Sequence, residues 1–462
     1  DDRWGVFWSV GGAWRISAEP WAADATWLTD LKLRADYGVI GNQNGIGRYS
    51  GYQTWSYSAT GYTTPGSYSP AGWKLSQNGF TTPLTWEKKK TVDVGLDFRL
   101  WDRFYGTMDW YQTNTDDVAW NAPISYAMSG QTTLAANSAR MRTRGFELEL
   151  GVDIIKTPNT LWSFNVNGST YYTTILEVPE GTGSAQLNGC WTAPADAWSI
   201  AGTGGTSNNI TYLRGIGKPY YNMYIYKYGG VDPASGLPLI ASTVSSTNID
   251  NLKKTSGNVY GDIVEGNTVY TTDYTLATRQ EFGDATPDFI GGFGTSLKWK
   301  NLDFSAQFAF QIGGKFLSVA DANHYYRSDQ TGYYHMSADL KGNTFTASNT
   351  GARYPMVILN NPNSNGYTGG STIGSWAYTD MALYSASYLN VKNLTLGYNF
   401  PQKWMDKIGI GGIRVYASFD NFWMLTTHKG IDPRMSLVGG MDVGAMAYPY
   451  MRTCSLGVNV TF

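Results

Sequence analysis

The feature that most constrains this chain is an alternation of apolar and polar side chains with a period of two residues. In residues 91–100 the even positions are apolar and the odd positions are mostly polar. The apolar set there is Val92, Val94, Leu96, Phe98 and Leu100, and near the end of the sequence it is Cys454, Leu456, Val458, Val460 and Phe462. Because successive side chains of a β-strand point to opposite faces, the pattern predicts strands with one apolar and one polar face.

Eleven segments carry this pattern, and the connections between them alternate in length. The segments are 4–16, 31–40, 86–100, 103–115, 140–155, 160–174, 286–300, 302–312, 386–400, 411–425 and 451–462. The short connections are 17–30, 101–102, 156–159, 301 and 401–410, and the long ones are 41–85, 116–139, 175–285, 313–385 and 426–450. Strict alternation predicts antiparallel hairpins with all long loops at one end, as in transmembrane β-barrels. A soluble sandwich also alternates apolar and polar residues, but it gives no reason for sorting the loops.

The parity of the strands predicts that this sheet does not close by itself. The last strand must end where the short turns lie, so the first strand runs in the same direction and the number of strands is odd. We expect eleven, or thirteen if Tyr220–Val231 begins one more hairpin at the turn signal around Asp232-Pro233 and Gly236. A complete barrel has an even number, so partner strands are expected beside residues 4–16.

Composition and motifs argue against several classes of function. Of the 462 residues, 15% are charged and 15% are aromatic, and the formal net charge of -2 does not suit nucleic acid. The two cysteines and three histidines show no metal-ligand spacing, and the glycine-rich run 41–47 lacks the lysine of a phosphate-binding loop. Glu147 and Glu149 share a strand face, which a polar barrel wall explains without catalysis. We therefore predict no enzyme activity, no metal and no cofactor.

Several motifs resemble the SusC/RagA family of TonB-dependent outer-membrane transporters. They are Ser387–Tyr398 (SYLNVKNLTLGY), Arg414–Phe422 (RVYASFDNF), Gly430–Pro433 (GIDP), Trp86-Glu87 followed by Val94–Phe98 (VGLDF), and Arg144–Leu148 (RGFEL). The resemblance implies an all-β, transmembrane antiparallel barrel of about 22 strands with a plugged lumen. Residues 1–462 would form its C-terminal part, about half of the barrel with 11–13 strands. The plug, the TonB box and the N-terminal extension would be absent from this chain.

The resemblance also implies a function and partners. It predicts import of glycans or peptides across the outer membrane of a Bacteroidetes-like bacterium, with a SusD-like surface lipoprotein as a lid and TonB as the energy source. The remaining partners would be the rest of the barrel, the plug and outer-membrane lipid, with no nucleic acid. A structural role in a larger envelope assembly is the alternative, and a soluble glycan-binding β-protein is the third hypothesis.

Candidate site residues come from the long loops and from the last strand. Aromatic side chains among Gly, Ser, Asn and Thr suit ligands that are flat and hydroxylated, although such rings also pack loops together. The candidates for contact with ligand or lid are Trp55, Tyr57, Tyr62, Trp73, Tyr325, Tyr326, Tyr333, Tyr334, Trp376 and Tyr378. Phe462 is predicted to be the terminal aromatic signal for barrel assembly. Lys88-Lys89-Lys90 suits either a solvated strand end, which we favour, or anionic lipopolysaccharide.

Overall fold

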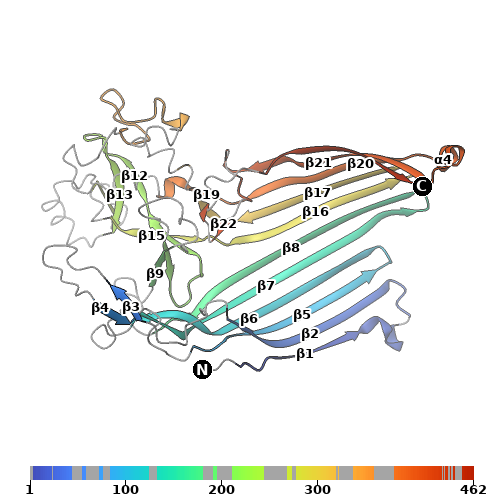
Figure 1. The fold of residues 1–462 in the computed structure, drawn as a ribbon, viewed down its shortest axis with the longest axis horizontal. Helices are drawn as coiled ribbons and strands as arrows, with labels where there is room; N and C mark the ends of the chain where they lie inside the picture. Colours follow the sequence, from blue (N-terminus) through green and yellow to red (C-terminus); the bar gives the residue numbers. More distant parts are fainter. Residues whose placement is uncertain are drawn as a thin grey trace.

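Eleven antiparallel strands form one sheet in the order of the sequence (Figure 1). The computed structural model describes residues 4–22, 24–43, 55–58, 72–75, 84–123, 133–179, 191–194, 211–243, 268–272, 277–318, 321, 337–357, 379–428, 430, 432–434, 437–438, 441–442 and 450–462. The strands are β1 (Trp8–Arg15), β2 (Leu28–Asn42), β5 (Glu87–Leu100), β6 (Phe104–Pro123), β7 (Thr133–Thr157), β8 (Thr160–Glu177), β16 (Pro287–Trp299), β17 (Leu302–Gly313), β20 (Tyr388–Asn399), β21 (Gly412–Thr426) and β24 (Thr453–Thr461). We call this sheet the wall. Each predicted segment corresponds to one of its strands, so the expected all-β fold with eleven strands is confirmed.

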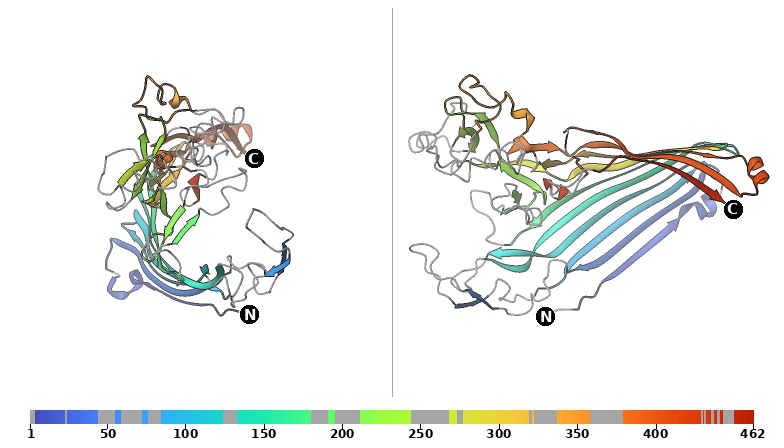
Figure 2. Two further views of the ribbon diagram at one scale, coloured as in Figure 1. Left: turned by 90° about the vertical axis from the view of Figure 1, so that its left-hand side faces the viewer. Right: turned by 45° about the horizontal axis from the view of Figure 1, so that its top comes forward.

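The connections are sorted as the sequence predicts. The short ones, including two 3-10 turns at 16–18 and 20–22 and helix α4 (Gln402–Ile408), lie at the turn end, on the right in Figure 1. The long ones lie at the opposite end, the loop end. β1 and β24 stand at the two ends of the strand order, and the sheet curves into an open trough (Figure 2). No helix among the described residues is long and apolar enough to cross a membrane.

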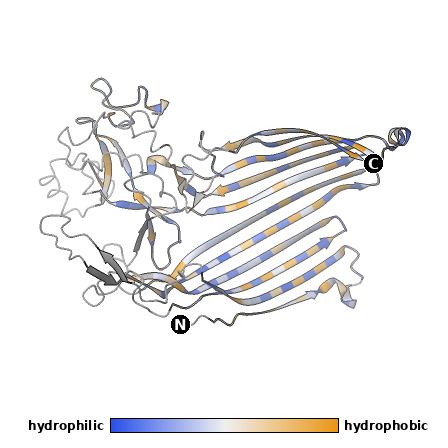
Figure 3. Cartoon of the chain, in the orientation of Figure 1, coloured by the Kyte–Doolittle hydropathy of each residue, from blue (hydrophilic) through white to orange (hydrophobic). Residues whose placement is uncertain are grey.

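The two faces of the wall differ in chemistry because the central parts of β2, β5, β6, β7 and β8 pair without a register shift. One row across β2, β5, β6, β7 and β8 consists of Ala35, Val94, Trp110, Phe146 and Thr170. The next row consists of Arg34, Gly95, Asp109, Glu147 and Ser169. The apolar side chains Val94, Trp110 and Phe146 are exposed rather than buried, and Figure 3 shows the same alternation of hydropathy along the strands. The wall is thus a single layer with an apolar face and a polar face, and the sandwich hypothesis is wrong.

Short sheets at the loop end form a second structure, which we call the cap. They are β9 (Trp191–Pro194), β10 (Thr211–Arg214), β11 (Asn222–Tyr226) and β15 (Arg279–Asp284); β12 (Tyr228–Val231), β13 (Pro238–Thr243) and β14 (Thr268–Thr271); and β18 (Lys315–Leu317), β19 (Leu383–Ser385), β22 (Leu437–Val438) and β23 (Met441–Asp442). A buried core joins several of them: Tyr212, Met223, Ile225, Ile240, Ala285, Leu317, Leu340, Tyr354 and Ala382. A separate hairpin of β3 (Trp55–Ser58) and β4 (Gly72–Leu75) lies at the same end and is not part of the cap (Figure 1).

Two expectations about the loops need correction. Residues 116–139 are mostly strand, because β6 and β7 continue past the wall as a hairpin beyond a bulge at Asp117, whose φ is 59°. Asn137 holds that bulge: its Nδ2 donates to the carbonyl oxygen of Asp117 at 2.6 Å, and its Oδ1 accepts from the amide of Thr85 at 2.7 Å. Tyr220–Val231 begins no additional hairpin of the wall. Its residues pair within the cap, where Asp232 and Gly236 close the turn between β12 and β13.

Candidate functional site

The polar face of the wall carries ion pairs that bridge neighbouring strands. Arg34 on β2 lies 2.7 Å from the carboxylate of Asp109 on β6 and 3.3 Å from that of Asp97 on β5. Its guanidinium crosses over β5 at Gly95, where an added Cβ would lie 2.5 Å from Arg34 Cζ. A glycine at this position therefore gives the arginine room to reach a strand beyond its neighbour.

The same arrangement recurs on the other half of the wall. Arg414 on β21 donates from Nε to Asp303 on β17 at 3.1 Å and from Nη2 at 2.5 Å. It crosses over Gly397 of β20, whose added Cβ would lie 2.5 Å from Arg414 Nη2. Both halves of the polar face are thus held by a cation that spans three strands.

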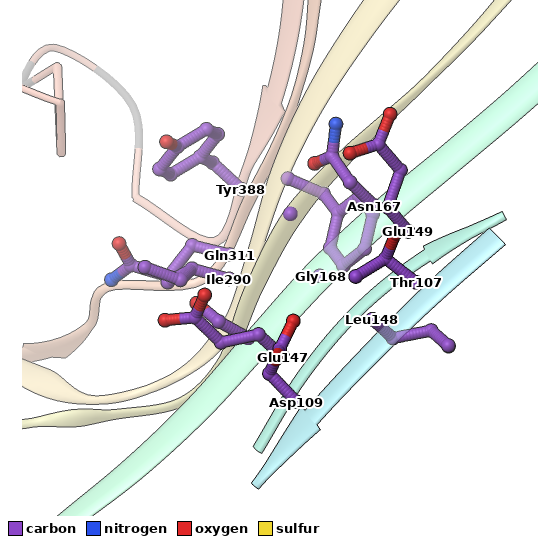
Figure 4. Close-up of a pocket in the computed structure, with 13 residues that line it drawn as sticks. Thr107, Asp109, Glu147, Leu148, Glu149, Asn167, Gly168, Ile290, Gln311 and Tyr388 are labelled. Carbon is purple, nitrogen blue, oxygen red and sulfur yellow. The ribbon is translucent and has the colours of Figure 1, made fainter. Parts of the chain in front are cut away.

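An open hollow of about 550 Å³ lies on the polar face between these two ion-pair clusters. Its lining comes from β6 to β20 and includes Thr107, Asp109, Glu147, Glu149, Asn167, Ser169, Gln311 and Tyr388. Side chains of strands so far apart converge only on the inside of a curved sheet, so the polar face is the concave one. Figure 4 shows Glu147 near Asp109, Tyr388 across the hollow, and Leu148 pointing away from the carboxylates.

The two glutamates of the hollow carry charge that the described residues do not neutralise. Glu147 and Glu149 are exposed, and within the described part of the chain neither forms an ion pair or a side-chain hydrogen bond. Each faces a polar neighbour on β6, Asp109 for Glu147 and Thr107 for Glu149. The centre of the concave face is therefore an acidic, hydrated surface that suits a cationic or hydroxylated group.

Tyrosine rings add an aromatic lining to the concave face. Tyr111 and Tyr105 on β6 lie over Gly145 and Gly151 of β7, where an added Cβ would lie 2.2 Å and 2.4 Å from the rings. Tyr416 on β21 lies in the same way over Gly457 of β24. Because the glycines have no side chain, the rings can lie against the sheet on its concave side, beside the hollow rather than in its lining.

The cap is attached to the wall through the loop end of β6, β7 and β8. Ile175 of β8 is fully buried with Val118, Trp120 and Ala139, and its amide donates to the carbonyl oxygen of Lys218 at 3.0 Å. Arg214, which is 6% exposed, stacks on the ring of Tyr220 with its Cζ 3.9 Å from the centroid. The hydrogen bond of Ile175 and the packing around it attach the cap to the loop end of β8.

Buried polar groups order the interior of the cap. The amide of Tyr228 donates to Oδ1 of Asp380 at 2.7 Å, and its hydroxyl donates to the carbonyl oxygen of Arg353 at 3.0 Å. Burial raises the pKa of both the Tyr228 hydroxyl and the Asp380 carboxyl. In contrast, Glu281 on β15 has its pKa lowered: burial opposes this shift, but Lys218 and Asn222 donate to the carboxylate and outweigh it.

Asp432, from the motif Gly430–Pro433, helps to hold the loop that follows β21. Asp432 is almost completely buried and accepts from Arg434 Nη2 at 2.6 Å. Arg434 also donates from Nη1 to Asn421 Oδ1 at 2.7 Å, and Asn421 sits in β21 with a φ of 52°. Asp432 of this motif is therefore paired with Arg434, which links the loop to Asn421 of the wall.

The structure describes only some of the candidate residues that the sequence suggests. Trp55 and Tyr57 on β3 pair in register with Leu75 and Trp73 on β4, so this hairpin gathers three of the candidate positions. Tyr62, Tyr325, Tyr326, Tyr333, Tyr334, Trp376 and Tyr378 lie outside the described residues. Phe462 follows β24 and is 97% exposed. Contact of any of these residues with ligand or lid, and the signal function of Phe462, stay predictions.

Sequence reasoning missed the residues that shape the concave face. Arg34, Asp97, Asp109 and Asp303 appear in the sequence as ordinary polar positions of alternating strands. What marks these residues is a glycine that lies between charged residues of the same parity on adjacent strands, as at Gly95 and Gly397. That signal requires the register between strands, which the sequence alone does not supply.

Comparisons with known proteins agree on one family. The sequence profile described as "TonB dependent receptor-like, beta-barrel" matches residues 1–276. TonB-dependent receptor P3 of Formosa agariphila is 26% identical to the chain over 473 residues, which is 100% of this chain and 42% of that protein. TonB-dependent receptor SusC of Bacteroides thetaiotaomicron is also 26% identical, over 100% of this chain and 40% of that protein.

A solved structure, the RagAB peptide transporter, has the same fold. It superposes with a TM-score of 0.69 at 23% identity, over 99% of this chain and 43% of that one. The chain therefore spans about two fifths of the length of the relatives that it matches. The recognition of a TonB-dependent receptor barrel that resembles SusC and RagA is confirmed.

Proposed function

The chain belongs to the family of TonB-dependent receptor-like β-barrels, and we propose that it lines an outer-membrane pathway for the import of glycans or peptides. The observation that carries this proposal is the wall, whose apolar face is exposed and whose concave face is charged. Water does not stabilise such an apolar face, whereas the hydrocarbon of a bilayer does. The concave face would then line a hydrated lumen, with the loop end outside the cell.

The proposal includes the rest of a barrel. β1 and β24 leave two sheet edges, and an unpaired edge in hydrocarbon costs several kcal/mol for each unsatisfied backbone group. Residues 1–462 would thus contribute the C-terminal part of the barrel, and other strands would pair with β1 and β24. A plug inside the lumen would be pulled open by TonB.

The cap offers a surface on which a partner could bind at the loop end. Its core is folded and attached to the wall, so it presents a fixed surface above the hollow. We propose that a SusD-like lipoprotein closes over this surface, with the aromatic hairpin of β3 and β4 among its contacts. The similar RagAB is named a peptide transporter, which favours peptides, while the aromatic residues of the loops suit glycans equally well.

Uptake measurements test this function directly. Cells that carry the protein in its complete barrel are given labelled oligopeptides and oligosaccharides, with and without an uncoupler of the inner-membrane proton gradient. We expect uptake of one class, abolished by the uncoupler. Folded protein in the outer membrane without energy-dependent uptake of either class would contradict import and favour the alternative of a structural component in an envelope assembly.

A pair of variants links uptake to the concave face. Glu147→Gln with Glu149→Gln removes the unpaired carboxylates of the hollow, and Leu148→Val changes the opposite face of the same strand. If peptides are the cargo, the double variant should reduce uptake of cationic peptides severalfold more than that of neutral ones. The Leu148→Val control should leave both unchanged.

A further inference from the structure

Five basic side chains gather on the outer, apolar face of the wall at its loop end. Lys88 and Lys90 on β5 have the same parity as Val92 and Val94, and the strand pairs without a bulge between them. Arg142 and Arg144 on β7 likewise share the parity of Phe146. The fifth basic residue, Arg140, precedes Arg142 by two residues and lies closer to the loop end of β7. Lys89 has the opposite parity and belongs to the concave face.

These residues form rows directly beyond the apolar belt. Val92, Gln112, Arg144 and Tyr172 are neighbours across β5, β6, β7 and β8, and the next row is Lys90, Asn114, Arg142 and Thr174. The row that precedes them contains Val94, Trp110 and Phe146. The change from apolar to basic is therefore abrupt.

The height of the rows matches the edge of a bilayer. Lys90 lies ten residues from Leu100, the last residue of β5 at the turn end. At about 3.4 Å per residue and a tilt of about 40°, this corresponds to about 26 Å along the barrel axis, close to the height of about 25 Å of the apolar band of such barrels. The basic rows thus stand at the level of the outer-leaflet headgroups.

Two of the five charges have no counter-charge among the residues that the structure describes. Lys88 pairs with Asp117 at 3.0 Å, Lys90 pairs with Asp116 at 2.7 Å, and Arg140 contacts both Asp116 and Glu177. Within the described part of the chain, Arg142 and Arg144 form no ion pair.

Among the described residues, the side chains of both arginines donate only to neutral amides. Arg142 Nε donates to Asn114 Oδ1 at 2.9 Å, and Arg144 Nε donates to Gln112 Oε1 at 2.8 Å. Because each arginine is anchored by Nε, its two terminal nitrogens remain available to an oxyanion from outside.

The patch is confined to one part of the outer face. At the loop ends of β17 and β21 the same face carries Ile312 and Leu425, which are exposed and apolar. A general preference for charge at strand ends would have placed cations there too. Tyr172, half exposed beside Arg144, adds the aromatic side chain typical of a membrane interface.

We propose that Arg142 and Arg144, flanked by Lys88, Lys90 and Arg140, bind the phosphate groups of a glycolipid in the outer leaflet of the membrane. Guanidinium groups bind phosphate oxygens through paired hydrogen bonds, and the patch lies where such headgroups lie. In this proposal Lys88 and Lys90 belong to the lipid-facing patch, while a solvated strand end stays the interpretation for Lys89. The proposal rests on the outer-membrane location proposed above but is independent of the cargo.

Lipid binding to the purified complete barrel tests the proposal. The apparent dissociation constant for bis-phosphorylated lipid A is measured in detergent for the wild type and for the Arg142→Gln/Arg144→Gln double variant. Since each charge near a headgroup contributes about fivefold, the double variant should bind about 25-fold more weakly. Lys89→Gln is the matched control on the opposite face and should stay within about twofold of the wild type.

Two further measurements identify the ligand and do not depend on the variants folding. Dephosphorylated lipid A should bind the wild type as weakly as the phosphorylated lipid binds the double variant. Raising salt from about 0.05 M to about 0.5 M should weaken binding of the phosphorylated lipid steeply. Equal binding of both lipids, an effect of Lys89→Gln as large as that of the double variant, or competition by inorganic phosphate at the affinity of the lipid would overturn the proposal. Because no cargo is involved, failure here leaves the uptake test unaffected.

Discussion

In the cap, Ile225 and Ile240 are completely buried, whereas in the wall Leu456 and Val458 are 84% and 63% exposed. The two regions contain similar apolar residues but use them in opposite ways. The cap packs them into a core of its own, and the wall presents them on one face of a single sheet. Burial of its own apolar side chains can therefore stabilise the cap in water, while the wall requires a surrounding apolar solvent.

The largest effect is expected from deleting an exposed residue that directly follows the last strand of the wall. Phe462 is 97% exposed, so its loss removes little packing. If it is instead the signal that the barrel-assembly machinery binds, deleting it should abolish most of the folded, heat-modifiable protein. Trp4→Ala, which removes a ring that is 93% exposed beside the opposite edge, is the control and should assemble normally. Wild-type amounts of folded protein after deletion of Phe462 would show that the signal lies elsewhere.

A cavity in the cap should cost more than the same truncation in the wall. Ile225→Ala leaves a void among fully buried neighbours and should lower the free energy of unfolding of the cap by about 2–5 kcal/mol. Leu456→Ala creates no void, so its loss should be smaller. Hydrogen exchange of the amides of β11 and β13 measures the first effect, and heat-modifiability of the barrel measures the second. Equal losses would break the distinction between the two regions.

A charge on the outer face of the wall should be the next largest effect. Leu96 lies on the apolar face of β5, near the middle of the apolar stretch between Lys90 and Leu100, so Leu96→Arg should cost about 2–4 kcal/mol. Gln307→Arg places the same charge on the concave face of β17, where water solvates it, and should cost much less. The comparison uses the folded fraction in detergent or lipid at increasing urea. Similar midpoints for both variants would falsify the assignment of the faces.

The smallest expected effect is the dependence of the stability of the cap on pH through the carboxyl group of Asp380. Burial raises the pKa of Asp380, so the folded cap holds its proton more tightly than the unfolded chain. Stability of the cap should therefore fall as the pH rises from about 4 through the raised folded pKa, with a slope of at most about 1.4 kcal/mol per pH unit. Asp380→Asn, whose Oδ1 can still accept from the Tyr228 amide, should reduce this slope. Asp284 contributes with the same sign, so a residual slope is expected.

The wall could be predicted from the sequence, and the cap could not, for a physical reason. In each wall strand a period of two residues distinguishes the two faces, as in residues 91–100, and its neighbours are the wall strands that come before and after it along the chain. Cap contacts join residues far apart, such as Tyr228 with Asp380, and its strands have only two to six residues, too short for a period to show. The bulge at Asp117 was missed because a chain that changes parity looks like the start of a loop.

The candidate site also has some features that the sequence predicts and others that it does not. The polarity of the concave face follows from the alternation, so Glu147 and Glu149 were placed correctly on one wall face. The bridging of Arg34 to Asp109 over Gly95 depends on register across three strands, which no single strand encodes. The parity of Arg142 and Arg144, opposite to that of Glu147 and Glu149, was visible in the sequence, but the register that brings them near Lys88 and Lys90 was not.

The buried core of the cap also has a consequence for temperature. Unfolding the cap exposes Ile225, Ile240 and their neighbours to water, which raises the heat capacity and makes its stability pass through a maximum near room temperature or below. Unfolding the wall within a bilayer moves its apolar residues from one hydrocarbon contact to another, so this contribution is nearly absent there. Cooling should therefore loosen the cap relative to the wall, because the hydrophobic contribution to its stability weakens in the cold.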